Sequence, residues 1–196
     1  MTPRFLLQTV PVWILGVAAT AMGLALGDFA RGPVSLSIAI TGGLVCYFAA
    51  HSFPQRMDWG MVFLVGLGLA AGVALASLPW LATSEVRLSA AGLALVGLAA
   101  AAAAGRSMPG LLRPLYPPLW IGAWIQVICL SVIQLTGLWS GGARPAATVA
   151  AVVFGGLTAA WFARVEDRPA PPAAMDLYLL ALNLFLASGV LLAPPA

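Results

Sequence analysis

The sequence has very little charge. Only 8% of its 196 residues are charged, it contains no lysine, and it has a single histidine. A soluble domain carries about 25% charged residues. Because 62% of the residues are hydrophobic and the mean hydropathy is +1.01, the chain lacks the polar side chains that cover a water-exposed surface. The sequence therefore excludes an ordinary soluble fold and predicts an integral membrane protein.

The scarce residue types also exclude several kinds of chemistry. Without lysine the chain cannot form a retinal Schiff base, and one histidine, His51, makes a histidine-based metal or catalytic centre improbable. We expect His51 to lie at the membrane interface among headgroups rather than to act as a ligand or base. Cys46 and Cys129 lie in apolar runs, where a free cysteine is usually a small hydrophobic residue. We predict no enzymatic activity, no cofactor and no metal.

What the sequence does contain is a series of long runs without charge. A helix needs roughly 20 apolar residues to cross a bilayer, and seven runs approach that length. They predict an all-α single domain over residues 1–196, a bundle of seven transmembrane helices. The runs are Val10–Gly27, Val34–Ala50, Gly60–Leu78, Leu88–Gly105, Leu119–Leu138, Ala146–Ala163 and Leu177–Leu192.

Prolines mark the breaks between the runs. They include Pro54, Pro79, Pro145 and the segment Pro169–Pro172. Proline ends a helix at little cost where water or headgroups satisfy the freed carbonyls. We therefore expect short turns at these positions, with no soluble domain inserted between helices.

The arginines predict the orientation of the bundle. With seven spans, six arginines fall on one side of the membrane and three on the other. The first group is Arg4, Arg56, Arg106, Arg113, Arg164 and Arg168, and the second is Arg31, Arg87 and Arg144. The positive-inside rule then places the N-terminus in the cytoplasm and the C-terminus outside. The net charge of +3 is accordingly a topology signal, and nucleic acid is not an expected partner.

A few neutral polar side chains remain inside the runs. The main ones are Gln126, Gln134, Thr158 and Asn183. An amide without a partner is costly in hydrocarbon, so we expect these groups to point into the bundle and bond across helices. They either stabilise the bundle or line a narrow polar path.

The last run carries a family resemblance. Its residues Leu177, Tyr178, Leu179, Asn183, Leu184 and Phe185 match, in register, a signature that reads roughly Leu-Tyr-Leu-Asp-x-x-Asn-Leu-Phe-Leu. This segment resembles the closing helix of the Bax inhibitor-1 family, also known as the transmembrane BAX inhibitor motif family. The resemblance implies a divergent bacterial-type member in the inner membrane, with six helices around a central seventh. It also implies a cation leak, usually for calcium, controlled by protonation of two aspartates.

The sequence departs from that family where the two aspartates stand. The one on the last helix aligns with Leu180, and the one near the end of the sixth helix falls at about Ala163. The family's pH switch is therefore lost at these positions. Asp167 and Asp176 lie four residues from them, each one turn toward the cytoplasm, and form a candidate displaced acid pair. The alternative is that both are solvated loop acids neutralised by nearby arginines.

Two classes of function stay open. One is a cation leak of the Bax inhibitor-1 type. The other is a non-conducting protein, either a subunit of a larger membrane complex or a modulator of a membrane protease. In both cases the lipid bilayer is a partner, joined by calcium or another cation in the first class and by other membrane proteins in the second.

Overall fold

The computed structural model describes residues 5–29, 33–53, 56–78, 81, 83–136, 139–164 and 170–193. Side chains are described for these residues except 5–6, 33–36, 40, 127–143 and 170–171. All regular secondary structure in the described residues is helical. This confirms the predicted all-α class.

Seven helices of 20 to 24 residues account for most of the described chain, and each overlaps one predicted run. They are α1 (Val10–Phe29), α2 (Pro33–Ser52), α3 (Met57–Ala76), α4 (Ser84–Ser107), α6 (Tyr116–Thr136), α7 (Trp139–Phe162) and α8 (Ala170–Leu192). Three short elements complete the order: η1 (Phe5–Thr9) before α1, and α5 (Pro109–Leu112) and η3 (Arg113–Leu115) between α4 and α6.

Within the described residues, five helical segments are long and apolar enough to cross a membrane. They are Leu7–Phe29, Met57–Ala76, Ser84–Ser107, Arg144–Phe162 and Pro172–Leu192. In α2 the described apolar stretch is shorter, Ser37–Ser52. These long apolar helices fit an integral membrane protein.

Most of the long helices begin before their charge-free runs, and α7 and α8 do so by seven residues each, at Trp139 instead of Ala146 and at Ala170 instead of Leu177. Pro145 lies inside α7 instead of in a turn. Proline lacks the N–H that would bond the carbonyl four residues earlier in the helix. The residue after it, Ala146, accepts a hydrogen bond at its carbonyl oxygen from the Gln126 side chain of α6, at 2.8 Å. α8 begins at Ala170, so Pro171 and Pro172 occupy its first turn. Proline fits there because those N–H groups have no intrahelical acceptor.

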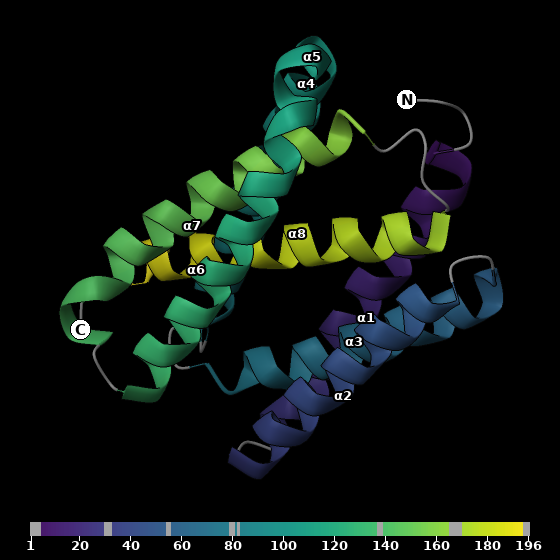
Figure 1. The fold of residues 1–196 in the computed structure, drawn as a ribbon. Coiled ribbons are helices and arrows are strands. Elements are labelled where there is room, and N and C mark those ends of the chain that lie inside the picture. Colours follow the sequence, from purple (N-terminus) through teal and green to yellow (C-terminus); the bar gives the residue numbers. More distant parts are fainter. Residues whose placement is uncertain are drawn as a thin grey trace. The chain divides into compact units, whose positions relative to one another are not determined.

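The chain divides into two compact units. The first contains α1, α2, α3 and the start of α8 up to Tyr178, and the second contains α4 to α7 and α8 from Leu179 onward. In the first unit, α3 packs against both α1 and α2 (Figure 1).

Glycine permits the contact between α1 and α3. A Cβ atom at Gly23, Gly68 or Gly72 would lie under 3.0 Å from backbone atoms of the partner helix. Small residues let helices approach closely in the membrane, where packing must replace the hydrophobic effect. Gly68 faces Gly16, and Gly72 faces Thr20, so the two helices run in the same direction. Gly43 meets Leu67 and Ala70, whereas Cys46 meets Gly66, so α2 runs opposite to α3.

The second unit is built on α7, which packs against α4 and α6. Its buried side chains include Phe154, Leu157, Thr158 and Trp161. The C-terminal turns of α4 and α7 meet closely, because a Cβ at Gly105 would lie under 3.0 Å from the Ala159 carbonyl oxygen. α6 instead runs opposite to α7, since Leu119 lies near Gly156 and Gly122 lies near Val153.

The close approach of α1 and α3 predicts an asymmetry between two glycines of the first unit. We expect Gly72→Ala to lower the free energy of unfolding by about 1–3 kcal/mol, because its methyl group would force the two backbones apart. Gly42→Ala is the matched control. No atom lies within 4 Å of a Cβ at Gly42, and alanine favours the helix by up to about 1 kcal/mol. Denaturant titration in detergent measures both, and equal effects would contradict the packing argument.

Candidate functional site

Two side-chain hydrogen bonds join the start of α8 to other helices of the first unit. Tyr178 bonds to Thr20 of α1, with 2.7 Å between the two hydroxyl oxygens. The Thr20 hydroxyl donates to the Gly16 carbonyl oxygen at 2.9 Å, so its single proton is used there. The Tyr178 hydroxyl is therefore the donor to Thr20.

Glycine also makes room for the Tyr178 ring. A Cβ at Gly16 would lie 3.1 Å from Cδ2 of Tyr178 and 3.0 Å from Cγ of Leu64. Tyr178 is 3% exposed. A buried phenol needs a hydrogen-bond partner, and the Thr20 hydroxyl supplies it.

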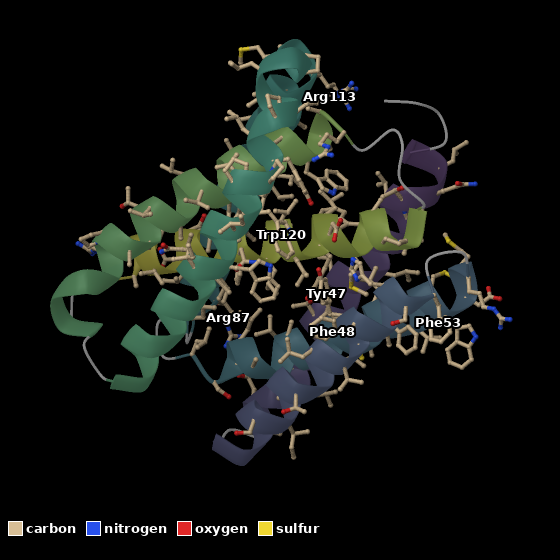
Figure 2. All side chains as sticks on the ribbon, viewed as in Figure 1. Tyr47, Phe48, Phe53, Arg87, Arg113 and Trp120 are labelled. Carbon is tan, nitrogen blue, oxygen red and sulfur yellow. The ribbon has the colours of Figure 1, made fainter. Side chains whose placement is uncertain are left out.

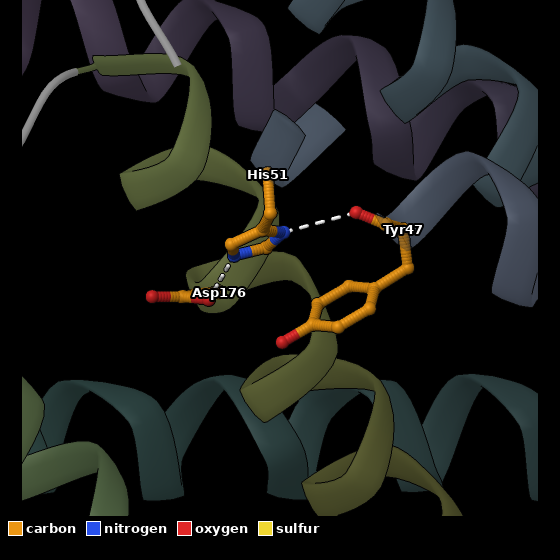
Figure 3. Close-up of polar contacts among 3 residues, drawn as sticks. All are labelled: Tyr47, His51 and Asp176. Atoms are coloured by element: carbon orange, nitrogen blue, oxygen red, sulfur yellow. Dashed lines mark hydrogen bonds and ion pairs between the residues drawn. The ribbon is translucent and has the colours of Figure 1, made fainter. Parts of the chain in front are cut away.

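The second bond joins α8 to α2. Nε2 of His51, in the last turn of α2, lies 3.3 Å from Oδ1 of Asp176. The other ring nitrogen, Nδ1, lies 3.0 Å from the Tyr47 carbonyl oxygen. Figure 3 shows the imidazole held between these two oxygens. The side chain of His51 is 34% exposed and that of Asp176 is 14% exposed.

These contacts fix the proton count of the pair. A carbonyl oxygen only accepts, so Nδ1 of His51 carries a proton and donates it to Tyr47. The bond to Asp176 then needs a second proton, either on Nε2 facing a carboxylate or on Asp176 facing a neutral ring. With one ring proton and an ionised Asp176, only one of the two contacts of the imidazole is a hydrogen bond.

The described part of the first unit contains few charged residues besides His51 and Asp176. Along the chain, Arg56 and Asp58 follow His51 at the start of α3, and both are exposed. The remaining acid in the described part of this unit is Asp28, in the last turn of α1. Cys46, Tyr47 and Tyr178 are the uncharged titratable groups of the described residues in this unit.

Of the two predicted acids, Asp167 and Asp176, the structure describes Asp176, and it lies in a helix rather than in a loop. Asp176 is the seventh residue of α8 and is bonded to His51, so the expectation that it is a solvated loop acid is wrong. The reason is that α8 starts at Ala170, about two helical turns before its charge-free run at Leu177. Asp167 lies outside the described residues, and the displaced pair stays a prediction. The side chain of His51 is 34% exposed and has a partner in Asp176, and its place among headgroups stays a prediction.

The predicted polar side chains of the second unit make two kinds of hydrogen bond, one kind between helices and one within a helix. Gln126 donates across helices to α7. Thr158 and Asn183 instead donate to carbonyls four residues earlier in their own helices, those of Phe154 at 2.6 Å and Leu179 at 2.8 Å. The expected interhelical bond is therefore absent from the described contacts of these two side chains. Such local bonds satisfy a polar group without a partner helix. The Gln134 side chain lies outside the described residues.

The residues of the family signature all lie in α8. Leu177, Tyr178 and Leu184 are buried, and Leu179, Asn183 and Phe185 are half-buried. The two positions that carry aspartate in the family, Leu180 and Ala163, are 6% and 7% exposed.

Sequence reasoning did not find the roles of the arginines at helix ends in the second unit. Nε of Arg113 donates to the Ala163 carbonyl at 2.7 Å, just after the end of α7. Nη2 of Arg144 donates to the Ala193 carbonyl at 2.9 Å, just after the end of α8. A cation at a helix C-terminus meets both unsatisfied carbonyls and the negative end of the helix dipole. The residues of each pair are 50 and 49 positions apart, so no local pattern indicates the contact.

The bond between Thr20 and Tyr178 predicts a measurable coupling. We expect Tyr178→Phe and Thr20→Val each to destabilise the protein, and the double variant to be less destabilised than the sum. The expected coupling is about 0.6 kcal/mol, the average for interhelical bonds in membranes. Unfolding of the four proteins in detergent completes the cycle. Strict additivity would show that the two hydroxyls do not interact.

Comparison of the chain with known protein-family models and with curated proteins gives no match.

Proposed function

We propose that this chain is a seven-span protein of the bacterial inner membrane and conducts cations as a leak of the Bax inhibitor-1 type. The observation that carries the proposal is the His51–Asp176 contact. In this proposal it replaces the family's aspartate pair as the proton-dependent control, and calcium is the first cation to test.

Helix directions support the seven-span topology. In a chain that crosses the membrane with every long helix, the first and third helices run in the same direction, and neighbours in sequence run in opposite directions. Within the first unit α1 and α3 are parallel, and α2 is antiparallel to α3. Within the second unit α6 and α7 are antiparallel. The arginine asymmetry then favours a cytoplasmic N-terminus.

The topology predicts the location of the residue Ala196. A reporter that is active only in the periplasm, fused after Ala196, is expected to be active, and a reporter that needs the cytoplasm is expected to be silent. The same pair of reporters fused after Ser107, at the end of the fourth span, gives the matched control with the opposite result. Activity of both reporters at either site would contradict the seven-span topology.

An ionisable pair inside membrane helices supports a transport function. Charged and ionisable side chains are costly in a membrane, and where they occur they usually belong to ion or proton pathways. Asp176 lies within the apolar segment Pro172–Leu192, and His51 lies in the last turn of the apolar stretch Ser37–Ser52 of α2. With 34% of its side chain exposed, His51 can exchange its proton with the surroundings.

The proton count gives the direction of the pH effect. The two contacts of the imidazole together need two protons, and a rise in pH favours the loss of one of them. In this proposal the remaining ring proton stays on Nδ1 and bonds Tyr47, so the start of α8 is released from α2. If the contact between His51 and Asp176 closes the cation pathway, the cation flux rises as the pH rises.

Ion flux into liposomes that contain only this protein tests the proposal. We expect the calcium flux of the native protein to increase between pH 5 and pH 8. Asp176→Asn and His51→Gln each remove the exchangeable proton from the contact, so both are expected to abolish the pH dependence. Asp58→Asn is the matched control, because it neutralises an exposed acid of the same unit and should leave the pH dependence unchanged.

The absence of flux at every pH would overturn the conduction proposal. It would favour the non-conducting alternative, a subunit of a larger complex or a modulator of a membrane protease. That alternative predicts a partner that copurifies in fixed stoichiometry in mild detergent. Flux with a pH dependence that survives both site variants would keep conduction but overturn the role of His51 and Asp176.

A further inference from the structure

Three exposed arginines gather at one end of the second unit. Arg106 is in the last turn of α4, Arg113 begins η3, and Arg164 follows α7 by two residues. The close approach at Gly105 brings the C-terminal turn of α4 against Ala159, Phe162 and Ala163 of α7 and its end. Arg106 and Arg164 directly follow two of the touching residues.

The third arginine is tied to the same place. Arg113 donates its Nε to the Ala163 carbonyl oxygen. The guanidinium carbon of Arg164 lies 4.8 Å from the centre of the Tyr116 ring, so the two planar groups form a cation–π contact. All three positive charges therefore lie around the C-terminus of α7. The negative end of the helix dipole there attracts and stabilises them.

Apolar side chains stand exposed beside the arginines. In the connection between α4 and α6, Met108 is 48%, Leu111 is 63% and Leu115 is 41% exposed. Trp120 and Trp124 follow in α6 and are partly exposed, with ring centres 5.6 Å apart. A mixture of exposed apolar residues, tryptophan and arginine is typical of the headgroup region of a membrane.

The described residues of this unit offer little negative charge to neutralise the group. Among them the one acidic residue is Glu85, in the first turn of α4. Glu85 is in the first turn and Arg106 in the last turn of this 24-residue helix, so they lie at opposite ends of it. Figure 2 shows Arg87, next to that first turn, and Arg113 at opposite ends of α4. Among the described residues, the arginine end is therefore locally positive; Glu166 and Asp167, which follow Arg164 in sequence, lie outside them.

We infer that Arg106, Arg113 and Arg164 form a binding site for the headgroup of an anionic phospholipid. The phosphate takes its place among the guanidinium groups, which match phosphate oxygens with paired N–H donors. The exposed Met108, Leu111 and Leu115 contact the start of its acyl chains. The site needs only that α4 and α7 cross the membrane, and it does not depend on ion conduction.

Native mass spectrometry of the full chain in detergent, titrated with phosphatidylglycerol or phosphatidylcholine, tests this inference. We expect the native protein to retain phosphatidylglycerol in preference to phosphatidylcholine. Each basic residue near a membrane surface contributes about 1 kcal/mol toward anionic lipid, so Arg106→Gln should lower the affinity for phosphatidylglycerol about fivefold. Arg106→Gln together with Arg113→Gln should lower it further.

Arg87→Gln is the control, since it removes the same charge from the other end of α4 and should leave retention unchanged. Glu166→Gln with Asp167→Asn removes the acids that follow Arg164 in sequence, and is expected to raise the affinity. Arg106 makes no side-chain bond in the described contacts, so its substitution keeps the fold, which an unchanged melting temperature verifies. Equal retention of the two lipids, an equal loss in Arg87→Gln, or binding of inorganic phosphate without a preference for phosphatidylglycerol would each overturn the inference.

Discussion

The structure depends on one constraint, that polar groups in a hydrocarbon environment must find partners inside the protein. In water an unpaired hydroxyl or amide is solvated, but in lipid it costs several kcal/mol. Thr20, Thr158, Asn183 and Ser188 all meet this demand in the same way, by donating to the carbonyl four residues earlier in their own helix. Because these groups are satisfied locally, few side chains remain to link helices. Most of the packing in the first unit then relies on glycine and close backbone contact.

The same constraint explains why two arginines donate hydrogen bonds to carbonyl groups at the ends of α7 and α8. The last carbonyls of a helix have no intrahelical donor, and α7 and α8 end without a basic residue of their own in the last turn. Arg113 and Arg144 supply the donors from other parts of the second unit. Each arginine thereby fixes a helix end to another element. In a chain with 8% charged residues, two of the nine arginines thus hold helix ends of the second unit in place.

The helices could be predicted from the sequence because exclusion of charge from an apolar span is a strong and local signal. The helix starts could not, since that rule ends a span at the first ionisable residue, whereas real helices continue into the headgroup region. α7 thus includes Arg144 and Pro145, and α8 includes Asp176. The neutral polar residues of the interior could be named, but not their partners. The contact between His51 and Asp176 joins residues 125 positions apart, and its existence depends on how α2 and α8 pack, which no single-sequence pattern reports.

The two side-chain bonds at the start of α8 differ in their burial and in whether they depend on an exchangeable proton. Asp176 and Tyr178 are two residues apart, so they point about 200° apart around the helix, one toward α2 and the other toward α1. The bond between Tyr178 and Thr20 is buried and joins two neutral hydroxyls. The bond between Asp176 and His51 is partly exposed and depends on an exchangeable proton. The removal of that proton would weaken the attachment of α8 to α2 and leave its bond to α1 in place. The start of α8 is thus held in the first unit by one bond that depends on an exchangeable proton and one that does not.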